Sequence, residues 1–196
     1  AGTGKTTLVS ALVKTLPKAG AKAILMAPTG RAAKVMSVYS GRKAMTIHRR
    51  IYRMQVVDGG GYKITLGPNQ QSNTFFIVDE ASMISEAGGN EGFRDGRNLL
   101  KDLIDFVASG DNCRLILIGD TAQLPPVGQE SSPALDIKRI VDYYGLRAGH
   151  FELTEVVRQE EGSGILENAT RLRDAIRKGE KSFRFNLGSP DLVRDR

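Results

Sequence analysis

The sequence predicts an α/β fold in which helices cover both faces of a parallel sheet. Short apolar runs with the length of buried strands alternate along the chain with segments of helical periodicity, and this order is typical of parallel strands joined by crossover helices. The chain also opens with a glycine-rich turn, residues 1–7, that leads into a helical pattern. A third observation is the apolar run 75–78, which ends in two acids, Asp79 and Glu80. Both features stand where an α/β sheet collects ligands.

The opening turn matches the back two-thirds of a phosphate-binding loop. The pattern G-x-x-x-x-G-K-[ST] would have its first glycine two places before Ala1. Backbone N–H groups of such a turn converge on phosphate oxygens, and the next helix offers its positive N-terminus to the same anion. We therefore expect ATP or another nucleoside triphosphate, with Lys5 on the β- and γ-phosphates and the Thr6 hydroxyl on Mg²⁺. The alternative is a glycine-containing turn before an ordinary helix. The residues expected to bind nucleotide are Gly2, Thr3, Gly4, Lys5, Thr6 and Thr7.

The remaining elements follow in order along the chain. Residues 4–18 predict the helix after the loop, and the apolar run 22–27 predicts a buried strand. Residues 31–36 predict a second helix that ends near Gly41, and Thr46 is the expected N-cap of a helical turn. Later predictions are a hairpin or a loop within 55–73, a surface loop at 88–96, a helix whose apolar face spans 99–107, a strand at 113–118, a helical stretch near 133–144, a strand at 151–154 and a helix at 162–178.

Asp79 and Glu80 form a Walker B pattern with the apolar strand before them. The tip of such a strand lies next to the phosphate loop in an α/β sheet. Asp79 can hold Mg²⁺ directly or through water, and Glu80 can orient and polarise the attacking water. An apolar strand that ends in two acids is by itself more often only a strand end. Its combination with the phosphate loop predicts a hydrolytic nucleotide site.

The segment 119–128, GDTAQLPPVG, directly follows another buried strand and should emerge at the same edge of the sheet. The neutral amide of Gln123 can sense a γ-phosphate by hydrogen bonding, and two prolines stiffen the exit from the turn. The alternative is a proline-bounded turn in which Asp120 caps a helix.

Composition sets few limits. The net charge of +6 permits a polyanionic partner and supports one only weakly. The single cysteine, Cys113, excludes an internal disulfide framework, and no Cys/His cluster suggests zinc. No apolar run approaches the roughly 20 residues that span a bilayer, so no membrane partner is expected.

Six segments, in this order along the chain, resemble the motifs of superfamily 1 DNA helicases. The similarity is greatest to the RecD-like branch, the exodeoxyribonuclease V alpha-subunit family, whose members move 5′ to 3′ on single strands and act in DNA repair and recombination. A match of six motifs in order is far more specific than any one of them. The segments are Gly2–Thr6, Ala27–Ala33, Thr46–Arg49, Val78–Met83, Gly119–Val127 and Leu153–Gln159.

The resemblance implies roles for individual residues. It places Arg158 on the γ-phosphate and makes Gln123 the residue that couples the nucleotide state to the grip on DNA. The implied catalytic residues are Lys5, Glu80, Gln123 and Arg158, and the implied metal ligands are Thr6 and Asp79. The implied contacts to single-stranded DNA are Pro28, Thr29, Gly30, Arg31 and His48. Two alternatives stay open: Arg31 can belong to a solvated helix face, and His48 can be a packed, hydrogen-bonded histidine.

The resemblance also implies a domain layout. Residues 1–160 correspond to the first RecA-like domain of a P-loop NTPase motor, and 161–196 to a helical segment leading toward a second motor domain. The resemblance implies a strand before the phosphate loop that this sequence does not contain, and Val157 stands where many relatives have an aromatic residue. We therefore expect either further upstream residues or an incomplete sheet. We also expect weak or absent ATPase activity of this fragment, because the second arginine finger and the adenine contacts of the family are missing. The implied partners are the second motor domain and other DNA-repair subunits, in the cytoplasm.

Two other functions stay open at this point. A P-loop ATPase of another class, such as a kinase-like or transport ATPase, would explain Lys5, Thr6 and Asp79 but not the segments 27–31 and 46–49. A scaffold that binds nucleotide without catalysis would keep the same residues. Stimulation of ATP hydrolysis by DNA separates a helicase from both.

Overall fold

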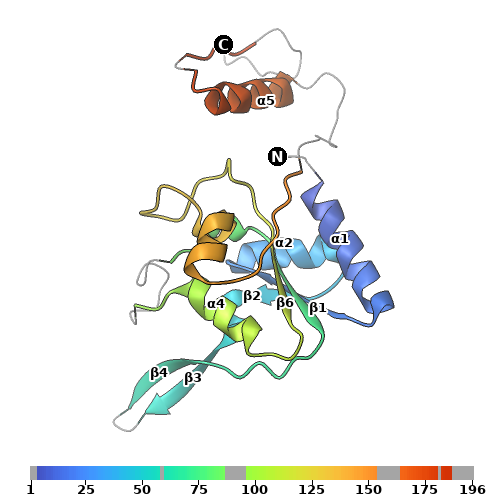
Figure 1. The fold of residues 1–196 in the computed structure, drawn as a ribbon, viewed down its shortest axis with the longest axis vertical. Helices are drawn as coiled ribbons and strands as arrows, with labels where there is room; N and C mark the ends of the chain where they lie inside the picture. Colours follow the sequence, from blue (N-terminus) through green and yellow to red (C-terminus); the bar gives the residue numbers. More distant parts are fainter. Residues whose placement is uncertain (1–3, 58–59, 87–95, 154–163, 181, 187–196) are drawn as a thin grey trace. The chain divides into compact units, whose positions relative to one another are not determined.

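The computed structural model describes residues 4–57, 60–86, 96–153, 164–180 and 182–186 (Figure 1). The chain forms two compact units. One unit spans Lys5–Glu152 and contains the sheet, and the other combines Ala1–Gly4 with Leu153–Arg196. The two units are described separately below.

The larger unit is built on a parallel sheet of four strands in the order β2-β1-β5-β6. Each strand is a short apolar run, which suits a sheet covered on both faces. The register places Leu25 opposite Ile77, and Ile77 opposite Ile116. All four strands therefore end at the same edge of the sheet. Their bounds are Lys22–Ala27 (β1), Ala44–Thr46 (β2), Thr74–Val78 (β5) and Arg114–Leu117 (β6).

Helices cover both faces of this sheet, as predicted. Side chains alternate between the faces of a strand, so Leu25 and Ile77 pack with Val9 and Val13 of one helix, while Met26 and Phe76 pack on the opposite face. The first face carries α1 (Lys5–Thr15), its 3₁₀ extension η1 (Leu16–Ala19) and α2 (Gly30–Ser40), and the second carries α3 (Ile47–Ile51) and α4 (Leu99–Ala108).

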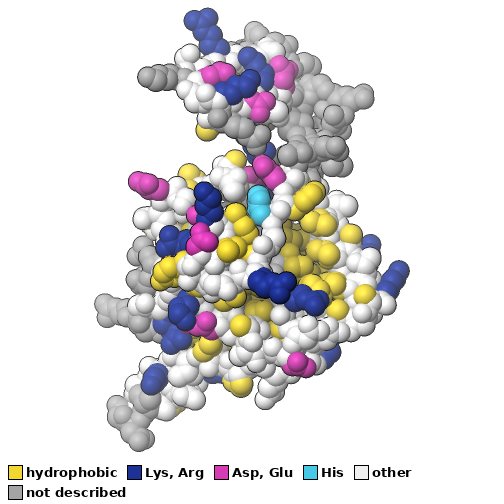
Figure 2. All heavy atoms as spheres, viewed as in Figure 1, with side chains coloured by type: hydrophobic (Ala, Val, Ile, Leu, Met, Phe, Trp, Pro, Cys, Tyr) yellow, Lys and Arg dark blue, Asp and Glu magenta, His cyan; other side chains and the backbone are white. Residues whose placement is uncertain are grey.

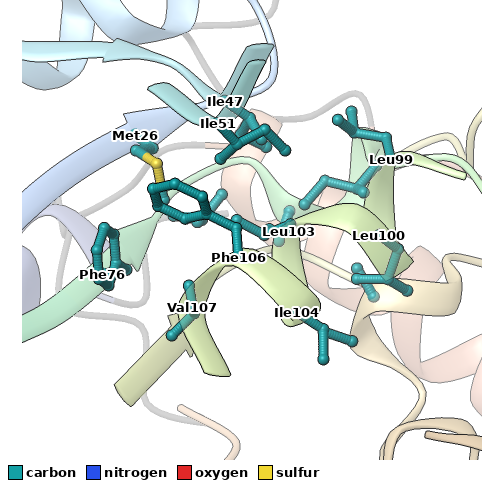
Figure 3. Packing of buried hydrophobic residues seen from close by; sticks show 14 of the residues in the cluster. Met26, Ile47, Ile51, Phe76, Leu99, Leu100, Leu103, Ile104, Phe106 and Val107 are labelled. Carbon is teal, nitrogen blue, oxygen red and sulfur yellow. The ribbon is translucent and has the colours of Figure 1, made fainter. Parts of the chain in front are cut away.

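The second face holds the larger core. Figure 3 shows Leu103 and Phe106 of α4 near Ile47 and Ile51 of α3, in a core that also contains Val107. The predicted apolar face of residues 99–107 is confirmed, because all six buried residues of α4 belong to this core. The rings of Phe106 and Phe76 meet edge to face with centroids 5.8 Å apart, a geometry that aromatic pairs prefer.

Between α3 and β5 the chain forms an antiparallel hairpin of β3 (Tyr52–Val57) and β4 (Gly61–Leu66). The hairpin is thus the correct one of the two alternatives for this region. Thr46 caps α3 as predicted, since its side chain accepts a hydrogen bond from the Arg49 amide.

The helical stretch predicted near 133–144 is confirmed, as the 3₁₀ helix η3 (Pro133–Leu135) followed by the π-helix η4 (Arg139–Tyr143). The strand predicted at 151–154 is wrong over its described residues. Residues 151–153 are in no strand, because Phe151 is 85% exposed and does not pack on the sheet. The loop predicted at 88–96 lies outside the described residues except for Gly96.

β6 is an edge strand within the described residues, because it pairs only with β5. The apolar Leu115, Ile116 and Leu117 are only half-buried. Figure 2 shows apolar side chains gathered on the surface beside α1.

The smaller unit contains α5 (Gly164–Arg177), close to the predicted helix 162–178. Its Asn168 is 4% exposed and accepts a hydrogen bond from the Asn186 amide. The Arg171 guanidinium lies 5.7 Å from the centroid of the Phe183 ring. These contacts pack residues 182–186 along the helix.

Candidate nucleotide and magnesium site

Gly4 is the first residue of the phosphate loop that the structure describes. This residue has φ +83°, a left-handed conformation that glycine adopts without strain, and α1 begins at Lys5. The start of a helix offers free N–H groups and a positive dipole end to an anion. Thr6 is half-buried in the first turn, and Thr7 is exposed. Gly2 and Thr3, the other residues predicted in this loop, lie outside the described residues.

Asp79 stands directly after β5 and is held on both oxygens. Its Oδ1 accepts a hydrogen bond from the Glu80 amide at 2.9 Å, and its Oδ2 accepts one from the Tyr39 hydroxyl at 2.5 Å. The Asp79 amide donates to the Met26 carbonyl oxygen on β1. The carboxylate is therefore fixed at the carboxyl edge of the sheet, where its sequence position predicted it.

Glu80 has a left-handed backbone, with φ 55° and ψ 36°. Residues other than glycine, asparagine and aspartate rarely adopt this conformation, which costs about 1–2 kcal/mol. The turn is held in place by the next residue, since the Ala81 amide donates to the Ile118 carbonyl oxygen at 2.8 Å. Non-glycine residues in such conformations cluster at functional sites. Glu80 is half-buried, so its carboxylate combines a rigid backbone with access to solvent.

The segment after β6 joins the Walker B turn through a hydrogen bond. The hydroxyl of Ser82, which is 1% exposed, donates to Oε1 of Gln123 at 3.0 Å. Ser82 lies in η2 (Ala81–Met83), immediately after Glu80. Gln123 is exposed, and beyond it Leu124 and Val127 are 88% and 81% exposed. The structure thus places Gln123 next to the Walker B turn, residues 79–82, where the Ser82 hydroxyl holds the oxygen end of its amide.

Asp120 pairs with the phosphate-loop lysine. Nζ of Lys5 lies 3.3 Å from Oδ2 of Asp120, and the side chains are 24% and 13% exposed. Burial alone would raise the pKa of the Asp120 carboxyl, but the hydrogen bond from the Ala122 amide and the charge of Lys5 hold this pKa below its ordinary value. Sequence reasoning considered Asp120 only as a helix cap, so this pairing across 115 positions was missed.

The residues present fit a magnesium site in which substrate phosphates and waters would complete the coordination of the ion. Mg²⁺ is usually held by one or two protein groups together with waters and substrate phosphates. Thr6 supplies a hydroxyl and Asp79 a carboxylate, both hard oxygen donors. No cluster of three or more His, Cys, Asp or Glu side chains occurs among the described residues, so a metal site made from protein ligands alone is not seen there.

The residues predicted to contact DNA lie at the same edge of the sheet, because they follow β1 and β2. Thr29 caps α2, since its hydroxyl oxygen accepts from the Ala32 amide at 3.2 Å, while Gly30 and Arg31 are exposed. Pro28 is buried and lies in the turn between β1 and α2. The ring of His48 lies 5.6 Å from that of Tyr52. Arg158 lies outside the described residues.

Two further residues of this site were missed, each for a physical reason. Ser82 stood inside a recognised motif, but nothing in its type distinguishes a hydrogen-bond donor from a turn residue. Tyr39 carried no signal at all, since an aromatic residue near the end of an amphipathic helix is typical of a core position.

One family model and two known proteins are similar to this chain over most of its length. A family model described as an AAA domain matches residues 1–185. The chain is 30% identical over 198 residues to the ATP-dependent RecD2 DNA helicase of Deinococcus radiodurans, an alignment that covers 97% of this chain and 23% of that protein. It is 31% identical over 179 residues to the ATP-dependent DNA helicase dda of Enterobacteria phage T4, with 89% of this chain and 36% of that protein covered. The chain therefore spans about a quarter and about a third of these relatives. None of the described helices is long and apolar enough to cross a membrane.

Proposed function

The chain belongs to the AAA domain family and resembles the RecD-like helicases of superfamily 1, and on this premise we propose that it is the first motor domain of an ATP-dependent DNA helicase. The proposed domain comprises residues 1–160. The observation that carries the proposal is the meeting of three motifs at one sheet edge: Lys5 contacts the segment after β6 through Asp120, and that segment contacts the Walker B turn through Gln123 and Ser82.

The site residues have complementary roles in the proposed hydrolysis of ATP. Lys5 and the start of α1 bind the phosphates, and Thr6 and Asp79 hold Mg²⁺. The ion, when bound, neutralises charge on the β- and γ-phosphate oxygens. Glu80 accepts a proton from the attacking water. Gln123 forms a hydrogen bond with the γ-phosphate and so links the nucleotide state to the position of the segment 119–128. Arg158 stabilises the negative charge of the transferred phosphoryl group.

Single-stranded DNA is the proposed polymer substrate, with 5′-to-3′ movement by resemblance. Arg31 is exposed and Gly30 presents a backbone with open space around it, so both can contact phosphates without reading sequence. A second motor domain is the proposed partner that completes the nucleotide site, and other DNA-repair subunits are further proposed partners.

The test is the rate of ATP hydrolysis, with and without single-stranded oligonucleotide, by a longer protein that joins this chain to the proposed second motor domain. We expect DNA to raise the rate, and both Lys5→Ala and Glu80→Gln to abolish it while DNA binding persists. Lys14→Ala is the matched control, because Lys14 is an exposed lysine of the same helix. A rate that does not respond to DNA would point to a P-loop ATPase of another class, and binding of nucleotide without any turnover would point to a scaffold.

A further inference from the structure

We propose that Tyr39 is a positioning residue for the magnesium site, because its hydroxyl fixes the Asp79 carboxylate and its backbone ties that carboxylate to the helix of the phosphate loop. The inference rests on the proposed nucleotide site and adds a residue that none of the recognised motifs assigns a role. It concerns the geometry of the metal ligands and not the chemistry of hydrolysis.

The first step is the contact between Tyr39 and Asp79. The hydroxyl donates to Oδ2 at 2.5 Å, while Oδ1 accepts from the Glu80 amide. A carboxylate has about four lone-pair sites, so these two bonds fix its plane and leave lone pairs on both oxygens. A metal ion, or a water bound to it, therefore meets a carboxylate whose orientation is already set.

The second step links this carboxylate to the other proposed metal ligand. Oγ of Ser10, on α1, lies 3.0 Å from the Thr6 carbonyl oxygen and 3.2 Å from the Tyr39 carbonyl oxygen. Tyr39 lies near the end of α2. Through Tyr39, α2 contacts Ser10 in the second turn of α1 with its backbone and Asp79 with its side chain. The elements that carry Thr6 and Asp79 are thus joined before any ligand binds.

The third step separates the role of the hydroxyl from that of the ring. The ring packs against the buried cluster that contains Val9, Val13 and Leu25, and a phenylalanine would keep that packing. What the hydroxyl adds is the orientation of Asp79.

Partners of metal ligands change metal affinity by about 10–100-fold when they are removed. We therefore expect Tyr39→Phe to raise the Mg²⁺ concentration for half-maximal effect about 10-fold in a titration that follows binding of a fluorescent ADP analogue. Affinity for the same analogue in EDTA should not change, since Tyr39 contacts no proposed phosphate ligand directly. That unchanged affinity also reports that the variant is folded.

The matched control is Tyr144→Phe. The Tyr144 hydroxyl also donates to a carboxylate, that of Glu86, at 2.6 Å, but this pair lies outside the proposed site. We expect its Mg²⁺ titration to match the wild type. A second variant pair tests the path: with Asp79→Asn already present, Tyr39→Phe should produce no further shift, because the group it orients is no longer a carboxylate.

Equal Mg²⁺ titrations for Tyr39→Phe and the wild type would overturn the inference and leave the proposed function standing. An equal loss of affinity in EDTA and in Mg²⁺ would also overturn it, because the hydroxyl would then support the fold of the site as a whole. If the wild type binds the analogue with no response to Mg²⁺, the proposed nucleotide site itself fails.

Discussion

Nζ of Lys5 lies 3.3 Å from Oδ2 of Asp120, so the lysine that we propose binds the nucleotide phosphates is paired with a carboxylate of the segment after β6. A phosphate group that binds to Lys5 must replace this carboxylate or share the lysine with it. When a phosphate displaces the Asp120 carboxylate, Asp120 loses Lys5 as its ion-pair partner. In the proposed site, the segment 119–123 would therefore respond directly to nucleotide binding.

The first prediction concerns nucleotide affinity. Asp120→Asn removes a competitor for Lys5 and also a negative charge near the phosphates, and both changes favour anion binding. We expect the dissociation constant for ADP in EDTA to fall roughly 3-fold, which corresponds to about 0.7 kcal/mol, within the range measured for partly exposed ion pairs. Asp105→Asn is the control, because Asp105 pairs with Lys101 on the surface of α4. Weaker binding by Asp120→Asn would show that the carboxylate orients Lys5 for the phosphate.

The second prediction concerns acid stability. The pKa of Asp120 is lower in the folded protein than its ordinary value, which is about 3.9. Its contribution to the free energy of unfolding is therefore complete above the ordinary pKa and is lost as pH falls through the lower, folded pKa. We expect the wild type to be more stable than Asp120→Asn in urea at pH 7, and this difference to shrink as the pH falls below about 3.9. A difference that is constant between pH 7 and pH 2 would contradict the assignment.

The third prediction concerns the backbone of Glu80. Glycine adopts its left-handed conformation without the cost that a Cβ imposes. We expect Glu80→Gly to be about 1 kcal/mol more stable than Glu80→Ala in urea unfolding, although neither variant should hydrolyse ATP. Comparison of the two variants cancels the loss of the carboxylate and isolates the backbone. Equal stabilities would mean that the turn relaxes without the glutamate.

The fourth prediction concerns Gly119. A Cβ atom at this position would lie 2.7 Å from Cδ1 of Leu135 and 3.0 Å from the Ser82 amide nitrogen. We expect Gly119→Ala to lose about 1–3 kcal/mol of stability, the usual range for overpacking. Gly149→Ala is the control, because no atom lies within 4 Å of its Cβ position. Urea unfolding of both variants checks the prediction, and equal midpoints would show that Leu135 can move aside at little cost.

Elements that depend on residues near one another in the sequence were predictable, and elements that depend on long-range pairing were not. The strands at 22–27, 75–78 and 113–118 were predictable because a buried parallel strand must be a continuous apolar run. The Thr46 cap was predictable because its partner lies three residues away. The strand expected at 151–154 was wrong over its described residues 151–153, since a short run with apolar residues does not itself provide a neighbouring strand with which to pair.

The contacts that organise the candidate site were beyond such reasoning. Tyr39 and Asp79 are 40 positions apart, and Lys5 and Asp120 are 115 apart. Each pair meets because a helix and a strand end converge at the sheet edge, and the pattern of a single segment does not specify which side chains then face each other. Sequence motifs predict which residues form the candidate site, and the fold determines which of them are partners.

The hydrogen bond between Ser82 and Gln123 gives the glutamine amide a direction. Because a buried hydroxyl occupies one lone pair of the amide oxygen, the orientation of the amide is set, and its NH₂ group, which can only donate, is presented to other partners. In the proposed site, this orientation favours an acceptor such as a phosphate oxygen as the partner of Gln123. Ser82 thereby fixes which end of the glutamine amide meets a ligand.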